Sequence, residues 1–285
     1  MTWVYNITNS NAPTDAGEII AVATVMTALA LLIVILRIYV RWGILNVFGI
    51  DDGLVIFSWF MSFGFTVVTS IQTRYGLGLQ NINDLPTANI QGFNKLQFAG
   101  APFYILGILG FKLSLLFAYM RFMPQGPYRH ATYVVIVLTT LFHLSFLITQ
   151  INLCNPIQAQ WDSSIPNYVC LQAVPVYTTM ASLTIFFDII VMALPFPVLL
   201  DLKMQDRKKI VILGLFGLGI FITIIQIIRI QTVRRLTNLT DSAPLITWSS
   251  VEANLGIIVA SIPCLSPLIK YFRERPPDFH QPLRC

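Results

Sequence analysis

The sequence predicts an all-α membrane protein, folded as a bundle of seven transmembrane helices. The 285 residues are 55% hydrophobic and only 11% charged, whereas soluble proteins carry about 25% charged residues. Polar segments separate seven apolar stretches, each close to the roughly 20 residues that a helix needs to cross a bilayer. These stretches are Ile19–Leu36, Leu54–Thr73, Ala99–Met120, Thr132–Thr149, Thr178–Leu200, Ile210–Ile228 and Leu245–Leu268. We expect one domain over residues 1–285, embedded in a lipid bilayer.

The segment before the first helix, residues 1–18, indicates how the bundle is oriented. It holds Asp15 and Glu18 but no Lys or Arg, so it lacks the basic region of a secretory signal peptide. With this tail outside, the inner segments hold twelve of the 18 Lys and Arg residues and the outer segments hold five. This asymmetry predicts an outer N-terminus and a short inner tail, 269–285, in the plasma membrane or the endoplasmic reticulum. It also explains the net charge of +5 without a nucleic-acid partner.

Two features of the predicted outer segments agree with this orientation. Asn6 and Asn238 each begin an N-x-[ST] sequon, so both are candidate glycosylation sites. Cys154 and Cys170 share the segment between the fourth and fifth helices, where an oxidising environment allows a disulfide.

The third helix contains Lys112 within the apolar stretch GFKLSLLFAYMR. Lys112 precedes Arg121, at the inner boundary, by nine residues, or about 13 Å along a helix. That is too far for the lysine side chain to reach the interface comfortably, and a charge at mid-bilayer costs about 2.5–3.5 kcal/mol. We therefore favour a buried partner over snorkelling. Gly110 and Ser114 lie on the opposite face, in a stripe of small residues that predicts close helix packing.

Asp188, in the fifth helix, is the candidate partner of Lys112, because helix geometry places the two residues at a similar depth. His143, in the fourth helix, is a third ionisable group near that depth. These residues form either a structural contact that fixes the register of the helices or a functional centre. The sequence leaves both interpretations open.

A second polar layer is expected nearer the outer side, where the sixth helix ends and the last helix begins. The residues concerned are Gln226, Arg229, Trp248, Glu252 and Asn254. Glu252 and Arg229 could pair and line a ligand-binding cavity. The alternative is ordinary polarity at helix ends, with Trp248 in the aromatic belt of the membrane interface.

Motifs for common catalytic and cofactor sites are absent from the sequence. There is no P-loop, G-x-S-x-G or H-E-x-x-H pattern, and the three histidines show no metal-ligand spacing. We therefore expect no metal and no cofactor. The last helix has no lysine before Lys270, which argues against a retinal Schiff base there. The third helix ends AYMRF, unlike the D-R-Y of common G-protein-coupled receptors.

Between RIYVRW (37–42) and CLSPL (264–268), six motifs, taken in order, resemble those of a known family. They are FGIDD (48–52), TRYGLG (73–78), KLSLLFAYMR (112–121), CNPIQAQWD (154–162), DIIVMALPFPVLLDLKMQDRKK (188–209) and WSSVEANLGIIVASIP (248–263). Their order and spacing resemble the fungal rhodopsin-domain family of seven-helix membrane proteins, which includes a satratoxin-cluster membrane protein and receptor-like, pathogenicity-associated relatives. The resemblance implies that Lys112, Asp188 and Glu252 occupy family-pattern positions.

One functional interpretation is a receptor-like protein. A small apolar metabolite would bind in an outer cavity near Glu252, Arg229 and Trp248. The bundle would then signal inward to a partner that contacts the loop DLKMQDRKK (201–209) and the Arg121 end of the third helix.

The alternative interpretation is an intramembrane enzyme of secondary metabolism. Asp188 or Glu252 would act as a general acid in the cyclisation or isomerisation of a hydrophobic substrate, while Lys112 and His143 would tune or relay the proton. A transporter is the third class, and it is less favoured because the sequence shows no inverted repeat.

Overall fold

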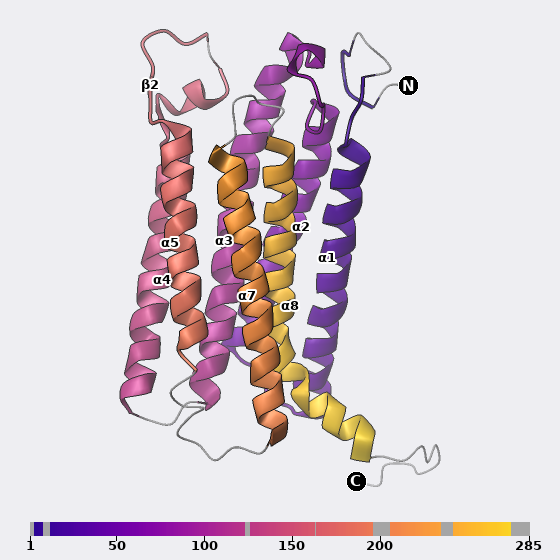
Figure 1. Cartoon of the computed structure of the whole chain (residues 1–285), viewed down its shortest axis with the longest axis vertical. Coiled ribbons are helices and arrows are strands. Elements are labelled where there is room, and N and C mark those ends of the chain that lie inside the picture. The colour runs from indigo at the N-terminus through magenta and orange to yellow at the C-terminus, as the bar shows by residue number, and fades with distance from the viewer. Residues whose placement is uncertain are drawn as a thin grey trace.

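The computed structural model contains seven long α-helices that run side by side (Figure 1). The structure describes the backbone of residues 3–7, 12–122, 126–162, 164–195, 206–234 and 242–274, without the side chains of residues 82, 122, 206–216, 218, 233–234 and 266–274. The helices are α1 (Ala16–Ile38), α2 (Ile50–Arg74), α3 (Thr87–Phe122), α4 (Pro127–Ile151), α5 (Ala173–Ala193), α7 (Asp206–Arg234) and α8 (Ser242–Glu274). The predicted seven-helix membrane fold is confirmed.

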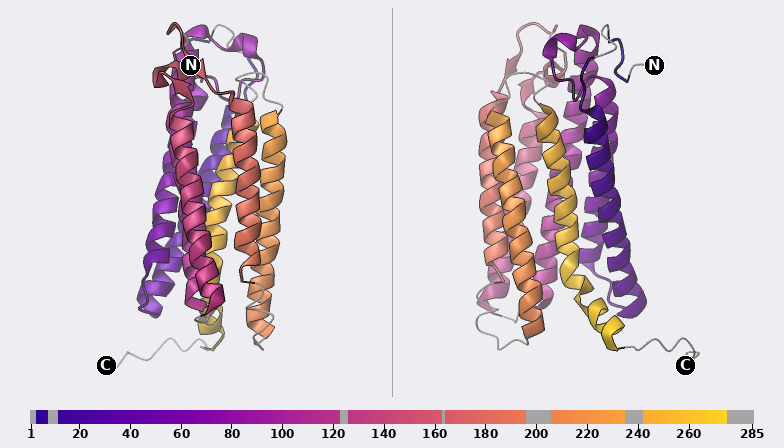
Figure 2. Two further views of the ribbon diagram at one scale, coloured as in Figure 1. Left: turned by 90° about the vertical axis from the view of Figure 1, so that its left-hand side faces the viewer. Right: turned by 45° about the vertical axis from the view of Figure 1, so that its right-hand side comes forward.

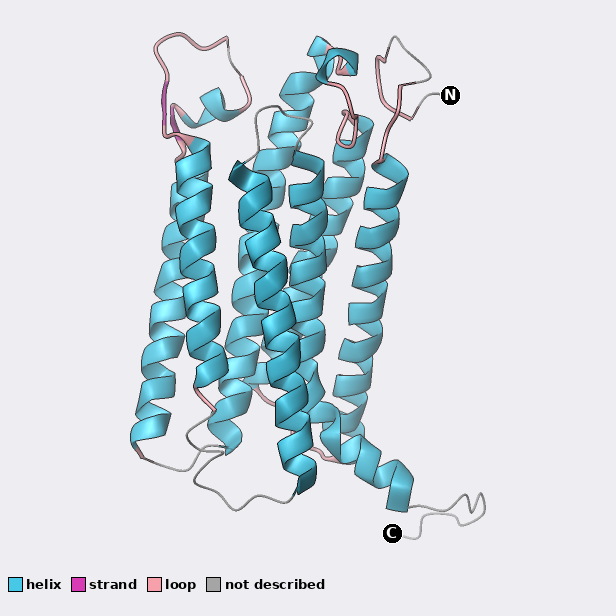
Figure 3. Ribbon diagram, in the orientation of Figure 1, coloured by secondary structure: helices cyan, strands magenta, loops and turns pink. Residues whose placement is uncertain are grey.

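Short elements complete the described chain. A π-helical turn, η1 (Tyr39–Ile44), continues α1, and η2 (Ile82–Asp84) and η3 (Ile157–Gln160) are single 3₁₀ turns. Two short antiparallel strands, β1 (Cys154–Asn155) and β2 (Val169–Cys170), lie between α4 and α5 (Figure 3). We call the end of the bundle that carries these strands the disulfide end, and the opposite end the C-terminal end. That the disulfide end faces outward stays a prediction from the sequence.

Most helices are longer than the predicted apolar stretches, α3 most of all, whereas α5 ends earlier than predicted. The described part of the chain has six helices that are long and apolar enough to span a membrane, and in α7 the apolar part covers Gly219–Thr232. Helix α3 has 36 residues and begins at Thr87, because its hydrogen bonds continue through a polar segment that hydropathy excludes. Helix α5 ends at Ala193, shortly before Pro195, which has no backbone N–H to donate to a helical carbonyl. Residues 196–200 of the predicted stretch lie outside the described residues.

Helices α3 and α8 form the centre of the bundle. In the most apolar 18 residues of α3 and of α8, 61% of the residues are buried. The corresponding share in α4 and α5 is 17%, so these two helices lie at the periphery. Figure 2 shows the bundle from two further sides. Small residues bring α2 and α3 together: the hydroxyl of Ser58 donates to the carbonyl of Gly107 at 2.7 Å, and that of Ser114 donates to the carbonyl of Asp51 at 2.7 Å. The small-residue face of the third helix thus packs on α2, away from Lys112.

A buried polar contact joins α1, α2 and α8. The amide oxygen of Asn254 accepts a hydrogen bond from Ser62 at 2.9 Å, and its amide nitrogen donates to Thr27 Oγ1 at 3.2 Å. The hydroxyls of Thr27 and Thr66 lie 2.8 Å apart. Because the Asn254 side chain is fully enclosed by these partners, it stabilises the helix packing.

The described part of the N-terminal segment packs on the TRYGLG turn after α2. The Trp3 indole donates to Thr73 Oγ1 at 3.1 Å, and the Arg74 guanidinium lies 3.9 Å from the centre of the Trp3 ring. Asn6 is exposed, and its amide donates to Asn89 Oδ1 at 3.0 Å. The sequon at Asn6 thus begins on the surface of the disulfide end. The other candidate glycosylation site, Asn238, lies outside the described residues.

We expect Gly78→Ala to weaken this N-terminal contact. Gly78 has φ +95°, and an added Cβ would lie 2.9 Å from the backbone nitrogen of Ala16. A non-glycine residue in such a conformation costs about 1–3 kcal/mol, so the melting temperature of the purified protein should fall. Gly17→Ala is the matched control, because nothing lies within 4 Å of its added Cβ and alanine favours the helix. Equal melting temperatures for the two variants would contradict the prediction.

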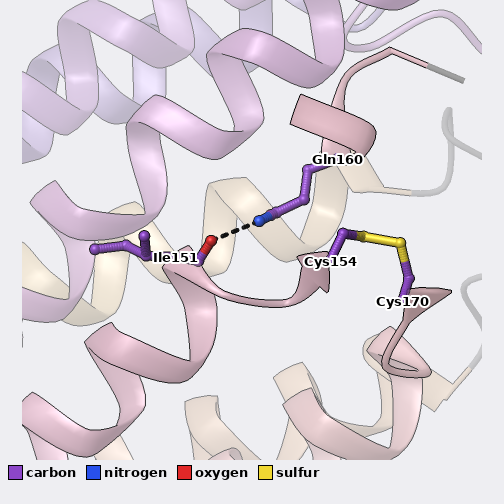
Figure 4. The surroundings of a disulfide bond; sticks show 4 residues. All are labelled: Ile151, Cys154, Gln160 and Cys170. Atoms are coloured by element: carbon purple, nitrogen blue, oxygen red, sulfur yellow. Dashed lines mark hydrogen bonds between the residues drawn. A yellow bond between two sulfur atoms is a disulfide. The ribbon is translucent and has the colours of Figure 1, made fainter. Parts of the chain in front are cut away.

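The loop between α4 and α5 is closed by the Cys154–Cys170 disulfide (Figure 4). The two cysteines are paired across strands β1 and β2, and the Gln160 amide donates to the carbonyl of Ile151 at 2.7 Å. Trp161 contacts Phe98 of α3, with ring centres 5.1 Å apart. The loop is therefore attached both to the end of α4 and to the polar extension of α3.

Candidate functional site

A continuous set of buried and half-buried polar side chains connects four helices inside the bundle. We call it the polar chain; it comprises Tyr104 and Lys112 of α3, Asp188 of α5, Gln226 and Arg229 of α7, and Glu252 of α8. At one end, Lys112 Nζ lies 2.8 Å from Asp188 Oδ1. Gln226 Nε2 donates to Asp188 Oδ2 at 2.6 Å and to Glu252 Oε1 at 2.7 Å. One amide group thus links the two carboxylates.

At the other end of the polar chain, Glu252 pairs with Arg229 and Tyr104. The Tyr104 hydroxyl donates to Glu252 Oε2 at 2.8 Å, and Arg229 Nη1 lies 3.2 Å from the same oxygen. Arg229 Nη1 also contacts the Tyr104 hydroxyl. The depth argument from the sequence separated these groups from Lys112 and Asp188 as a second layer, but the Gln226 side chain joins the two layers into one network.

The charges of the polar chain cancel. Lys112 is 1% exposed and Glu252 is fully buried, so each would be costly alone in a medium of low polarity. Two cations and two carboxylates compensate one another, and each carboxylate also accepts at least one hydrogen bond. Such pairing is the condition under which ionised groups persist inside a protein or a membrane.

The larger described cavity lies beside the Arg229 end of the polar chain. Its volume is about 100 Å³, and residues of α2, α3, α4, α5, α7 and α8 line it. Most of the wall is apolar or aromatic, with Tyr104 and Arg229 next to Glu252 and with Gln150 contributed by α4. Arg229 Nε and Gln150 Oε1 are buried and have no hydrogen-bond partner among the described residues.

A smaller cavity of about 50 Å³ lies at the other end of the polar chain. Lys112 and Asp188 form part of its wall, together with Tyr119, Met192 and Gly256. The polar chain therefore has Arg229 and Tyr104 in the wall of the larger cavity, and Lys112 and Asp188 in the wall of the smaller one. Four consecutive contacts therefore link the walls of the two cavities.

Three residues singled out from the sequence lie outside both cavities and outside the polar chain. His143 Nδ1 is 2.8 Å from the carbonyl of Thr139 in its own helix, and His143 Nε2 has no hydrogen-bond partner among the described residues. No described hydrogen bond or ion pair links His143 to the polar chain. Asn254 is occupied by its contacts with α1 and α2, and Trp248 is half-buried beside neither cavity.

Sequence reasoning missed a second charged group, at the C-terminal end of the bundle. We call it the arginine–aspartate cluster; it comprises Arg37, Arg41, Asp51, Asp52 and Arg121. Arg37 Nη2 lies 2.7 Å from Asp51 Oδ2, its Nε lies 2.8 Å from Asp52 Oδ1, and its Nη1 donates to the carbonyl of Ala260 at 2.7 Å. The cluster thus joins α1, α2 and α8, and Arg121 of α3 reaches Asp51 Oδ1 at 2.5 Å.

The sequence contained a signal for this cluster that we interpreted differently. Arg37 and Arg41 are four residues apart and so share a helix face, and the two aspartates begin the next helix. The count of basic residues places both arginines in an inner segment, and the structure shows that Arg37 is fully buried and Arg41 is 6% exposed. These charges therefore hold helices together through ion pairs.

The arginine–aspartate cluster does not suit a metal ion. Ligand atoms of Asp51, Asp52 and Cys264 lie within 4.8 Å of one another, which is a metal-like spacing. However, Arg41 Nη2 already lies 2.7 Å from Asp51 Oδ2 and 3.0 Å from Cys264 Sγ. The guanidinium groups therefore supply the positive charge that a cation would bring.

Comparison with known proteins places these features in a family context. The chain is 27% identical over 212 residues to a SAT4 family membrane protein of Emericella nidulans, covering 73% of this chain and 54% of that protein. It is 25% identical over 169 residues to fugralins biosynthesis cluster protein 2 of Gibberella zeae, covering 56% and 42%. It is 24% identical over 176 residues to receptor GIN3 of Arthrobotrys oligospora, covering 60% and 42%.

The chain spans about half the length of these curated relatives. No solved structure matches it. Residues 36–271 match the fungal rhodopsin domain, a range that includes every residue of the polar chain and of the arginine–aspartate cluster. A match over most of a seven-helix chain identifies this multi-pass membrane protein as a member of the fungal rhodopsin domain family.

Proposed function

We propose that this protein is a receptor-like sensor that binds a small, largely apolar molecule in the larger cavity. The observation that carries the proposal is the double position of Arg229, which is part of the cavity wall and also pairs with Glu252 of the polar chain. A ligand that contacts Arg229 changes the strength of its contacts with Glu252 and Tyr104. Through Gln226, that change reaches the Lys112–Asp188 pair.

The family context supports the same proposal. One relative is named a receptor, and others are named for biosynthesis clusters of secondary metabolites. A protein that senses a metabolite is compatible with both kinds of name. The cavity wall fits this ligand class, because binding sites for small molecules are mainly apolar with a few placed polar groups.

The geometry gives less support to an intramembrane acid catalyst. Asp188 pairs with Lys112, and Glu252 pairs with Arg229. The Gln226 amide donates to an oxygen of each carboxylate, so both carboxylates are held as hydrogen-bond acceptors. A general acid would need a free proton to donate toward the substrate.

The contact surface for an inner signalling partner is also part of the proposal. Of the loop DLKMQDRKK, residues 201–205 lie outside the described residues, and only the helical backbone of 206–209 is described. Arg121, at the end of α3, has a side chain that is 30% exposed while it pairs with Asp51. An acidic partner surface at the C-terminal end would compete with Asp51 for this arginine.

The proposal predicts that Arg229→Gln abolishes a transcriptional response without blocking any single chemical step. The host organism, a deletion strain and an Arg229→Gln strain would be exposed to extracts of the host culture, and transcripts and metabolites would be measured together. For a receptor, the response and all products under its control fall together in both mutants. Arg129→Gln, far from the cavity at the start of α4, is the control and should behave like the wild type.

An enzyme would give a different pattern in the same experiment. One apolar precursor would accumulate while transcripts stayed unchanged, and membranes containing only this protein would convert that precursor. This result would refute the receptor proposal and revive Glu252 or Asp188 as a catalytic acid.

A further inference from the structure

We infer that the larger cavity selects an uncharged ligand with one carbonyl-type hydrogen-bond acceptor and one hydroxyl or N–H donor on an otherwise apolar frame. This inference rests on the proposed function, because it names the class of molecule that the sensor binds. Three features of the cavity carry it: an unused donor, an unused acceptor, and a wall whose charges already cancel.

The unused donor is Nε of Arg229. Arg229 is 8% exposed, and its Nη1 is taken up by Glu252 and Tyr104. Its Nε has no partner among the described residues, although the side chain forms part of the cavity wall. Buried N–H groups in folded proteins are almost always paired, so the cavity is where a partner for this group has to bind. A carbonyl oxygen of the ligand satisfies it.

The unused acceptor is Oε1 of Gln150. Gln150 is 4% exposed and reaches the same cavity from α4, whereas Arg229 reaches it from α7. Its amide group contacts the hydroxyl of Tyr177 in the same wall, and its amide oxygen has no hydrogen-bond partner among the described residues. A ligand hydroxyl or N–H would donate to this oxygen. A ligand that pairs with both groups therefore carries an acceptor for Arg229 Nε and a donor for Gln150 Oε1.

The charge balance of the polar chain excludes an anionic ligand. Arg229 alone would attract a carboxylate, but Glu252 already neutralises it at 3.2 Å, and Lys112 is neutralised by Asp188 at 2.8 Å. An added carboxylate would leave one uncompensated negative charge in a largely apolar cavity, where ions are poorly solvated. A neutral ketone, ester or amide makes the same hydrogen bond without that cost.

Five single-ring probes of matched shape test the inference: 4-hydroxyacetophenone, acetophenone, 4-ethylphenol, ethylbenzene and 4-hydroxybenzoate. Single rings keep the probes small, but a closed cavity of about 150 Å³ holds only benzene, so this cavity of about 100 Å³ has to widen to admit them. The first probe has both groups, the next two have one each, the fourth has neither, and the last replaces the ketone by a carboxylate of the same shape. Ligand-observed NMR would measure binding to the full chain in lipid nanodiscs at about pH 6.5, where the benzoate is ionised and the phenols are not. Empty nanodiscs would correct for partition into lipid.

We expect 4-hydroxyacetophenone to bind tightest. Each missing hydrogen bond should weaken binding by about 2–12-fold, so acetophenone and 4-ethylphenol should follow, and ethylbenzene should come after them. The carboxylate probe should bind on the order of tenfold more weakly than its ketone counterpart, or not at all.

Variants assign each preference to its side chain. In Gln150→Leu the preference for the hydroxyl should disappear, so that 4-hydroxyacetophenone and acetophenone bind alike. In Arg229→Lys a cation remains for Glu252 but Nε is lost, so the preference for the carbonyl should disappear. Gln158→Leu, on the exposed turn η3, and Arg129→Lys make the same chemical changes away from the cavity and should keep the wild-type order. Melting temperatures would show whether each variant is folded, and the wild-type series decides the question if one is not.

The outcomes separate this inference from the proposed function. Tightest binding of 4-hydroxybenzoate would overturn the inference in favour of an anion site. Equal affinity for all five probes would overturn it and leave an apolar cavity that still serves as a sensor site. If no probe binds while the host keeps its Arg229-dependent response, the ligand class named here is wrong and the receptor proposal survives with a ligand of another class.

Discussion

Arg37→Leu should lower the free energy of unfolding by about 3–5 kcal/mol, because it removes the central cation of a buried ionic cluster. The Arg37 side chain is fully buried and bonds to both aspartates and to the Ala260 carbonyl. Without Arg37, the negatively charged Asp51 and Asp52 stay buried at the start of α2 and lose part of the positive charge that neutralises them. Chemical unfolding of the purified protein in detergent, followed by fluorescence, would measure the loss.

Arg121→Gln is the matched control for this experiment. Its side chain is 30% exposed, and Asp51 keeps Arg37 and Arg41 at 2.7 Å when Arg121 is removed. A partly exposed ion pair contributes up to about 1 kcal/mol, so the unfolding curve should shift only slightly. A shift for Arg121→Gln as large as that for Arg37→Leu would show that burial does not set the energy of this cluster.

Lys112→Met should destabilise the protein by several kcal/mol, whereas the double variant Lys112→Met, Asp188→Leu should recover much of that loss. The single change leaves Asp188 with the Gln226 hydrogen bond but without its cation, and an unpaired charge inside a membrane protein is costly. The double change removes both charges. The two single variants, the double variant and the wild type form a thermodynamic cycle that gives the coupling energy of the pair.

The cycle also distinguishes a structural pair from a switching pair. A stable double variant that no longer responds in the host would assign Lys112 and Asp188 to transmission of the signal. A double variant that responds normally would leave them as a contact that fixes helix register. Additive effects of the two single changes would contradict the ion pair itself.

Some contacts of the site were accessible from the sequence because they depend on depth alone. The rise of 1.5 Å per residue places Lys112 and Asp188 at similar depths in two helices, and the structure brings them to 2.8 Å. The pairing of Glu252 with Arg229 followed from the same reasoning. Depth does not specify which helix faces which, however. His143 and Asn254 lie at suitable depths, but their hydrogen bonds are made outside the polar chain.

Other contacts depended on the conformations of individual side chains. Gln226 joins two polar layers because its amide reaches both carboxylates, and no sequence pattern specifies that reach. The burial of Arg37 and Arg41 depends on α2 and α8 covering the end of α1. A rule that treats basic residues between helices as exposed could not have indicated it.

The sequence by itself determined the membrane class, the number of helices and the family, because each depends on features that are local or ordered along the chain. Hydrophobic length selects a spanning helix, and the order of motifs identifies relatives. Only the tertiary structure decided the larger cavity, the polar chain that runs from it, and the arginine–aspartate cluster that fastens the C-terminal end. These depend on helix rotation and on which side chains meet across helices, and burial makes every unpaired polar group there costly.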